Sequence, residues 1–215
     1  MQKVHSRFAA SAVALGLIAG VASATPAAAQ TVVDDWSKLQ MAAAPQVKPV
    51  KIEPQTTALL VLDLLKQSCN NERRPRCVAT IPQVAKLIAD ARAHNVAVVY
   101  SITTSTKAED ILPPVAPKAG EPMVASNADK FVGTDLEKIL KDKGIKTVIV
   151  TGTTAEGAVL YTASGAAFRG MNVIVPLEGS TAGSEFAEAV TAWVLTNAPA
   201  VGAKTTLTKI DMIGY

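Results

Sequence analysis

Histidine and cysteine are scarce in this sequence, and their scarcity limits the chemistry that the chain can carry out. The 215 residues contain two of each, and His5 lies in an N-terminal segment that resembles a leader. His94 is the histidine that remains, at the end of a predicted helix. A single imidazole cannot provide a zinc site of ordinary ligand spacing, and no histidine is placed to act as the base of a serine triad. The sequence therefore excludes both kinds of site.

Repeats and long charged tracts are also absent. There is no glycine period and no heptad run, and hydrophobic residues make up 49% of the chain, which excludes a collagen-like, coiled-coil or wholly disordered protein. The composition is that of one globular domain. Function must then come from a folded site.

The first 29 residues have the pattern of a secretory signal peptide. Lys3 and Arg7 are followed by an uncharged apolar run at 8–21 and by small residues at 27–29. An uncleaved anchor is the weaker alternative, because the run is shorter than the roughly 20 residues that span a bilayer. Cleavage after Ala29 removes two basic residues and no acidic one, so the formal net charge falls from +3 to +1. We expect a periplasmic or secreted protein with no nucleic-acid or membrane partner.

Cys69 and Cys77 both remain after cleavage, and in an exported protein we expect them to form a disulfide. They enclose a polar segment that contains Arg73, Arg74 and Arg76, which we call the arginine loop. Closing so short a loop stabilises the fold by about 2 to 3 kcal/mol on the chain-entropy estimate. A reactive thiol and a metal site are the weaker alternatives, because oxidation removes the thiolate.

Strand-like and helix-like segments alternate through the rest of the chain. This order predicts a single α/β domain with a doubly wound, Rossmann-like, mostly parallel sheet and helices on both faces. We divide the chain into the signal peptide at 1–29, an N-terminal arm at 30–56 and the domain at 57–215. Buried strands are predicted at 58–62, 96–101, 147–151 and 172–175, and an edge strand at 205–210.

Two capping boxes mark predicted helix starts, at Thr80 with Gln83 and at Thr134 with Glu137, and Gly144 ends the second of these helices. A third helix, rich in alanine and glycine, is predicted at 155–169. The last helix is predicted to bury an apolar face made of Phe186, Ala189, Val190, Trp193 and Val194.

The stretch from residue 102 to 130 contains prolines and is too long for an ordinary connection between a strand and a helix. A functional loop or lid and a passive surface excursion are equally consistent with it.

Two strand ends carry residues suited to chemistry, because ligands of such sheets bind beyond the carboxyl ends of the strands. Asp63 directly follows the apolar run 59–62, where partial burial raises the pKa of a carboxyl and suits it to acid-base catalysis. A turn or helix-capping aspartate is the structural alternative. The small, polar segment 152–158 enters a helix, whose first N–H groups are placed to hold a carboxylate or an oxyanion.

Four segments together resemble the isochorismatase-like hydrolases, also called the cysteine hydrolase superfamily. They are LLVLD at 59–63, KFVGTDL at 130–136, VIVTG at 148–152 and AAFRG at 166–170, and the likeness spans about 57–182. Such proteins hydrolyse small amides, such as nicotinamide or carbamoyl compounds, or the vinyl ether of isochorismate. The resemblance implies a small-molecule substrate and a homo-oligomer.

The amide-cleaving members of the family use an aspartate, a lysine and a cysteine nucleophile. The family aspartate falls on Asp63, and the cysteine position falls on Ala158. The family lysine stands five or six residues before the phenylalanine of the Phe-x-Gly-Thr segment, which here is Ala125 or Ser126. Lys130 stands beside that phenylalanine instead, and we take it as the second catalytic candidate.

The resemblance also places a non-proline cis peptide and an oxyanion hole at Thr153 and Thr154. With Gly157 and Ala158 these residues are the predicted substrate-binding set. Without a thiol at position 158, the thioacyl mechanism of the amidases cannot operate. Isochorismatases, by the same resemblance, lack the cysteine and use the aspartate as an acid.

Three functions remain open. The first is an exported hydrolase of a small molecule that uses Asp63, helped by Lys130 or Lys66, with water as the nucleophile. The second is a catalytically silent ligand-binding protein on the same fold. The third is an interaction module that presents the arginine loop to acidic partners. No motif predicts a nucleotide, flavin or metal cofactor.

Overall fold

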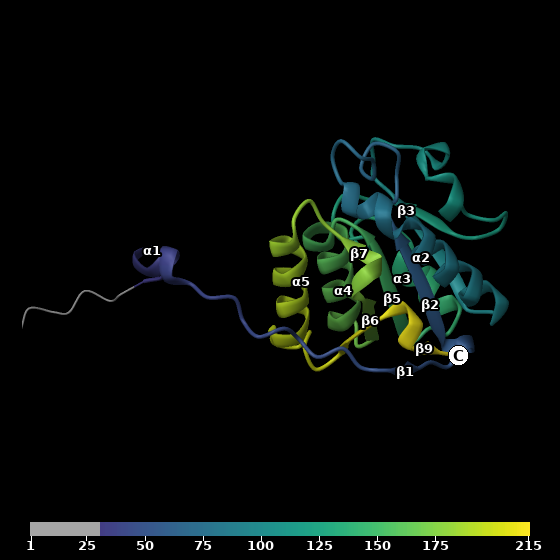
Figure 1. Cartoon of the computed structure of the whole chain (residues 1–215). Helices are drawn as coiled ribbons and strands as arrows, with labels where there is room; N and C mark the ends of the chain where they lie inside the picture. The colour runs from purple at the N-terminus through teal and green to yellow at the C-terminus, as the bar shows by residue number, and fades with distance from the viewer. Residues whose placement is uncertain (1–30) are drawn as a thin grey trace, which may run out of the picture. The chain divides into compact units, whose positions relative to one another are not determined.

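The computed structural model describes residues 31–215 (Figure 1). The predicted signal peptide lies outside the described residues. Residues 31–41 and 42–215 form two units, and each is described by itself. The first unit contains α1 (Val32–Asp35) and the 3-10 turn Trp36–Lys38. A capping box opens α1, because the Thr31 N–H donates to Asp34 Oδ2 at 2.8 Å.

The main sheet of residues 42–215 has seven strands, and all of their pairings are parallel. The strands predicted from apolar runs are all present, whereas β4 and β7 were not predicted. A short β7 (Ser180–Thr181) pairs with the end of β5. The order across the sheet is β4 (Met123–Ala125), β3 (Ala97–Ile102), β2 (Thr57–Leu62), β5 (Thr147–Thr153), β6 (Asn172–Pro176) and β8 (Thr205–Thr208).

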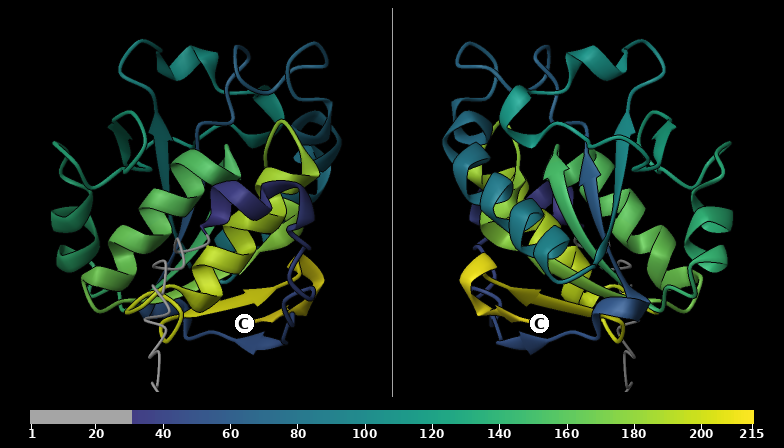
Figure 2. Two further views of the ribbon diagram at one scale, coloured as in Figure 1. Left: turned by 90° about the vertical axis from the view of Figure 1, so that its left-hand side faces the viewer. Right: turned by 90° about the vertical axis from the view of Figure 1, so that its right-hand side faces the viewer.

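A second, two-stranded sheet joins the two ends of this unit. In it, β1 (Val50–Lys51) pairs in parallel with β9 (Ile213–Gly214). Just before β1, the Lys48 N–H donates to the Leu207 carbonyl at 2.9 Å, and Thr208 Oγ1 donates to the Lys48 carbonyl at 2.7 Å. The chain around Lys48 therefore runs along the outer edge of β8 (Figure 2).

Helices cover both faces of the main sheet, as predicted (Figures 1 and 2). One face carries α2 (Pro75–Ala93), and the other carries α3 (Leu136–Asp142), α4 (Leu160–Phe168) and α5 (Glu185–Asn197). The structure is thus a single α/β domain of the doubly wound kind. Among residues 31–215, none of the helices is both long and apolar enough to span a bilayer.

The central strand β2 is buried on both faces, which explains its unbroken apolar run. Successive side chains of a strand point to opposite faces. Leu60 and Leu62 accordingly pack in the core under α3, α4 and α5, whereas Leu59 and Val61 pack in the core under α2. After Thr57 the side chains of β2 are all apolar up to its end at Leu62, and Asp63 is the next residue.

The predicted start of α2 is wrong, because the helix begins at Pro75, five residues before Thr80. Proline at the first helical position has its φ angle preset and needs no hydrogen-bond acceptor for its nitrogen. Thr80 lies within the helix, where its Oγ1 donates to the Cys77 carbonyl at 2.9 Å. The helix continues through Pro82 and ends at Ala93.

The second predicted capping box is half correct. Thr134 Oγ1 accepts from the Leu136 N–H at 3.2 Å, but the Glu137 carboxylate bonds to Lys141 and Arg169 instead of the start of α3. Gly144 follows the end of α3 with φ +66°, the conformation predicted for a C-terminal glycine.

The predicted apolar face of α5 is also wrong. Phe186 and Trp193 are 63% and 49% exposed, and the buried side chains of this helix are Thr191, Ala192 and Leu195. The bulky residues and the buried residues of α5 lie on different faces, because a helix that packs closely against its neighbours favours small side chains such as alanine and threonine. The predicted helix at 155–169 is present as a π-helical turn, Ala155–Val159, followed by α4.

The long segment between β3 and α3 is folded against the domain. It contains 3-10 turns and β4, and Ile111 and Val115 are buried in the core under α2. Both of its ends approach the carboxyl edge of the sheet, where Thr103 and Asn127 line a pocket described below.

Gly152 sits where β5 leaves the sheet, opposite Leu62 of β2. Its φ is +136°, and a Cβ built on it would lie 2.0 Å from the Leu62 carbonyl oxygen. Because that oxygen belongs to the backbone of a central strand, it cannot move aside. A side chain at position 152 is therefore incompatible with the contact between β2 and β5.

We expect Gly152→Ala to lower the free energy of unfolding by about 2 to 5 kcal/mol, from overpacking and an unfavourable φ together. Gly183→Ala is the matched control, since a Cβ there meets nothing within 4 Å and its φ is not positive. That variant should stay within about 1 kcal/mol of the parent protein. Urea unfolding of both variants measures the difference, and equal stabilities would contradict the assigned contact.

Candidate functional site

The candidate site lies at the carboxyl ends of β3, β2 and β5. Asp63 follows β2, Ser101 is near the end of β3, and Thr153 ends β5. Chain connections run from β2 to β3 and β4 on one side and from β5 to β6 and β8 on the other, so the strand order reverses between β2 and β5. Ligands of doubly wound sheets bind at such a reversal.

The Asp63 side chain is almost fully buried, with 5% exposure. Its Oδ1 accepts from Ser101 Oγ at 2.7 Å, and its Oδ2 accepts from Lys130 Nζ at 2.7 Å. Its backbone has φ +52°, a left-handed conformation that aspartate and asparagine tolerate better than most residues. Both carboxylate oxygens are thus held in fixed directions.

Lys130 is completely buried and saturates its ammonium group with protein acceptors. Nζ donates to Asp63 Oδ2 and to the Ser126 and Asn127 carbonyls, each at 2.7 Å. The side chain therefore folds back to the position-126 backbone, where the family resemblance expected the lysine.

Burial raises the pKa of the Asp63 carboxyl above its ordinary value of 3.8. The Lys130 charge and the hydrogen bonds from Lys130 and Ser101 lower the pKa, but they offset burial only in part. A carboxyl with a raised pKa is a better acceptor and donor of protons near neutral pH than an exposed one.

The turn after β5 forms the opposite wall of the site. The Thr153–Thr154 peptide bond is cis, as the resemblance implies. Thr153 Oγ1 donates to the Thr181 carbonyl of β7 at 3.1 Å, so this hydroxyl is occupied by the fold. The π-helical turn begins at Ala155, and the Gly157 and Val159 N–H groups both donate to the Thr154 carbonyl at 3.1 Å.

These elements line an open pocket of about 330 Å³, which we call the Asp63 pocket. Five of the predicted site residues line it, and Lys130 stands behind Asp63. Its lining residues are Asp63, Ser68, Arg74, Thr103, Asn127, Ala128, Thr153, Thr154, Gly157 and Ala158.

Gly157 and Ala158 keep one wall of the Asp63 pocket free of bulky side chains. A Cβ on Gly157 would lie 2.6 Å from Thr154 Oγ1. Ala158 is 5% exposed, and its methyl group is all that it contributes. The two cysteines of the sequence are bonded to each other, Cys69 to Cys77, so no thiol is available in this chain. The predicted disulfide is confirmed.

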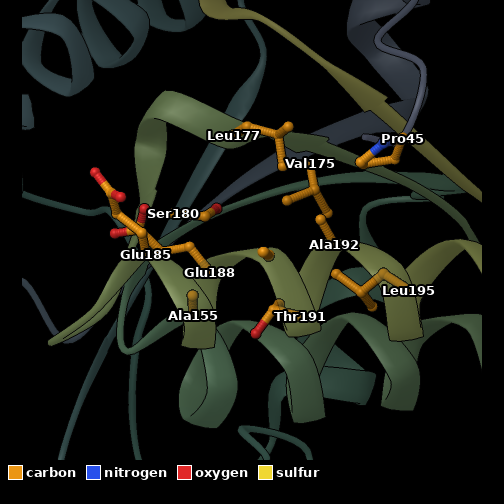
Figure 3. Close-up of a pocket in the computed structure, with 11 residues that line it drawn as sticks. Pro45, Ala155, Val175, Leu177, Ser180, Glu185, Glu188, Thr191, Ala192 and Leu195 are labelled. Atoms are coloured by element: carbon orange, nitrogen blue, oxygen red, sulfur yellow. The ribbon is translucent and has the colours of Figure 1, made fainter. Parts of the chain in front are cut away.

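A second pocket, of about 270 Å³, lies between α5 and β6 (Figure 3). Its walls are mostly apolar and include Val175, Leu177 and Leu195. Its two carboxylates, Glu185 and Glu188, are both paired with Arg76 of the arginine loop, at 3.0 and 2.6 Å. Ser180 and Thr191 are buried polar residues of its lining, but each charged group in it is already paired with Arg76.

Several residues of the site were not predicted. Ser101 and Thr103 stand near the end of a predicted strand, so the rule that located Asp63 would also have found them. Asn127 and Arg74 come from irregular segments, whose path no periodicity describes. Lys66, a predicted helper of Asp63, lies elsewhere, since its Nζ donates to the Glu109 carbonyl at 2.7 Å.

The geometry can be compared with known proteins at this point. The model of the isochorismatase domain family matches residues 57–208. The chain belongs to the isochorismatase family. Within residues 31–215, no three histidine, cysteine or acidic side chains gather to hold a metal ion.

Two curated relatives of the isochorismatase family align with parts of the chain. The secreted isochorismatase effector Isc1 of Verticillium dahliae is 28% identical over 141 residues, or 60% of this chain and 74% of that protein. An N-carbamoylsarcosine amidase of an Arthrobacter species is 43% identical over 65 residues, or 30% of this chain and 25% of that protein. The second match thus spans a quarter of its relative.

Solved structures of family members share the fold. An isochorismatase-like hydrolase from Alkaliphilus metalliredigens has a TM-score of 0.66 at 24% identity, over 73% of this chain and 95% of that chain. A cysteine hydrolase from Pseudomonas syringae pv. phaseolicola has a TM-score of 0.65 at 21% identity, over 79% of this chain and 95% of that chain.

The buried ion pair gives a prediction that needs no substrate. Lys130→Met leaves the Asp63 carboxylate buried without its partner, and we expect a loss of about 3 to 5 kcal/mol in the free energy of unfolding. Asp63→Asn should lose a similar amount, because it leaves the ammonium uncompensated. The double variant should lose less than the two single losses together, by about 1 kcal/mol or more. Urea unfolding at pH 7 completes the cycle, and strictly additive losses would show that the two groups are not coupled.

Proposed function

We propose that this protein is an exported hydrolase of a small molecule, in which Asp63 acts as the acid-base group and water is the nucleophile. The observation that carries the proposal is the buried, paired Asp63 carboxylate facing a pocket of small-molecule size in a chain without a free thiol. A pocket with a few convergent polar groups and a perturbed carboxyl is the usual setting for such chemistry.

In the proposed reaction Asp63 removes a proton from a water molecule whose oxygen attacks the electrophilic carbon of the substrate. The bond from that carbon to the leaving group breaks, and Asp63 returns the proton to the leaving atom. The proposed donors to negative charge on the substrate oxygen are the Ala155 and Glu156 N–H groups, because those of Gly157 and Val159 already donate to the Thr154 carbonyl. Lys130 acts through Asp63 as a positioning residue, since it does not line the pocket.

Export is supported by two independent observations. The Cys69–Cys77 disulfide is stable in oxidising compartments and unusual in the cytosol. The fungal relative Isc1 is described as a secreted effector. Both agree with the signal peptide predicted at residues 1–29.

The relatives suggest which bonds to test. One is named for the amide of N-carbamoylsarcosine and the other for isochorismate. A panel of both compounds, nicotinamide, simple esters and vinyl ethers covers the bond types that water can attack with acid-base help.

We expect the oxidised protein to turn over at least one member of this panel, and Asp63→Asn to lower its kcat/KM by about 100- to 10,000-fold. Asparagine is the suitable replacement because it tolerates the left-handed backbone of position 63. Asp129→Asn, outside the pocket lining, is the control and should retain activity. Turnover that survives in Asp63→Asn would remove Asp63 from the reaction.

The pH dependence tests the direction of proton transfer. As a base, Asp63 must be ionised, so activity should be full above the pKa of its carboxyl and fall about tenfold per pH unit below it. Because burial raises that pKa, the acidic limb of kcat/KM should have its midpoint above 3.8. If activity instead falls above the pKa of the Asp63 carboxyl, Asp63 must be protonated to act, and its role is that of the initial acid.

A silent ligand-binding protein is the second candidate, and Ala158 favours it. The family resemblance expects a nucleophilic cysteine there, and a methyl group takes no part in bond breaking. A protein of this kind would bind panel compounds without turnover, and Asp63→Asn would change their affinity alone.

A further inference from the structure

We propose that Arg74 forms an anion subsite in the Asp63 pocket, so that the substrate is a small carboxylate. This inference rests on the proposed function, in that it takes this pocket as the place where the substrate binds. It adds the chemical class of the substrate and the residue that selects it.

Arg74 is the basic residue on the pocket wall. One of its guanidinium nitrogens donates to the Ser68 carbonyl at 2.8 Å, and the side chain is half-buried. No carboxylate of residues 31–215 pairs with it, whereas Arg76, Arg92 and Arg169 each pair with glutamate. The guanidinium thus keeps donors for a ligand on the pocket side.

The charge balance of the pocket favours an anion. Asp63 is compensated by Lys130 at 2.7 Å, so together the two groups contribute no net charge. Arg74 then gives the pocket a net positive charge, and no other charged side chain lines it. Arginine binds carboxylates with two parallel hydrogen bonds, which fixes the orientation of the ligand as well as its charge.

The arginine loop holds Arg74 in place before any ligand arrives. The disulfide closes the loop on both sides of it, and its backbone N–H donates to the Asn70 carbonyl at 2.8 Å. Its carbonyl accepts from the Cys77 N–H at 3.0 Å, at the start of α2. Arg76 fastens the loop to α5 through Glu185 and Glu188. A side chain that is positioned in advance loses less entropy when it binds.

Arg73 provides a matched control in the same loop. It carries the same charge, but it is exposed, its guanidinium donates to the Gln67 carbonyl at 3.2 Å, and it does not line the pocket. An effect of general charge on ligand attraction would be the same for both residues. An effect of a subsite would be confined to Arg74.

The test compares acids with neutral counterparts of the same shape by calorimetry on the purified, oxidised protein. The pairs are nicotinate with 3-acetylpyridine, succinate with succinamide, and N-carbamoylsarcosine with its methyl ester. We expect at least one acid to bind more tightly than its counterpart. Arg74→Gln should weaken that acid about 10- to 100-fold, as for the loss of a charged hydrogen-bond partner, and leave the neutral ligand unchanged. Arg73→Gln should change neither by more than about twofold.

Arg74→Lys separates charge from geometry and is expected to recover part of the affinity, because lysine keeps the charge without the bidentate fork. Thermal unfolding of each variant shows whether the loop remains intact. The proposal is overturned if no acid binds more tightly than its counterpart, or if Arg74→Gln and Arg73→Gln have equal effects.

Failure of this inference and failure of the proposed function have different signatures. Turnover that depends on Asp63 but is equal for an acid and its neutral counterpart, and unchanged in Arg74→Gln, would overturn the subsite and keep the hydrolase. Acid binding that depends on Arg74 with no turnover of any panel compound would keep the subsite and overturn the hydrolase.

Discussion

The fully buried ammonium of Lys130 is the constraint on which the rest of the site depends. A charge without access to water is tolerated only when it is paired and its protons are accepted. Asp63 provides the charge, and the Ser126 and Asn127 carbonyls accept the other protons. To meet this demand the chain must bring the end of β2 and the segment before α3 to one point. Where these two segments meet, the Asp63 side chain also lines the pocket.

The other polar groups around Asp63 come from the carboxyl ends of the neighbouring strands. β3 contributes Ser101 and β5 contributes the Thr153–Thr154 turn, because parallel strands all end on one side. The segments that cover this edge of the sheet are not regular strands or helices. They are loops, of which the arginine loop is fixed by a covalent bond and by Arg76. In the proposed site, the catalytic group is thus held by the sheet and the substrate-selecting arginine by a loop that the disulfide closes.

Much of this arrangement could be predicted from sequence, and the limits have physical reasons. Buried parallel strands are continuous apolar runs, so the sheet and Asp63 at the end of β2 followed directly. The disulfide followed from two cysteines in an exported chain. Lys130 was a candidate from the resemblance, but its contacts with Asp63 and with the Ser126 and Asn127 carbonyls were not predicted, because a linear motif does not describe the path of a loop. The buried face of α5 was misassigned because alanine and threonine carry little hydrophobic signal. Arg74 was predicted as part of a surface loop and not as a pocket residue, because no sequence pattern tells where an irregular loop points.

The chain around Lys48 has a consequence for the behaviour of the protein in concentrated solution. A parallel sheet ends in strands with unpaired backbone groups, which recruit strands from other molecules. At the β8 edge, the Lys48 N–H donates to the Leu207 carbonyl, and the Lys48 carbonyl accepts from Thr208 Oγ1. This segment serves as a cap against association between sheets of neighbouring molecules. Its removal would expose the backbone edge of β8 as a template for aggregation.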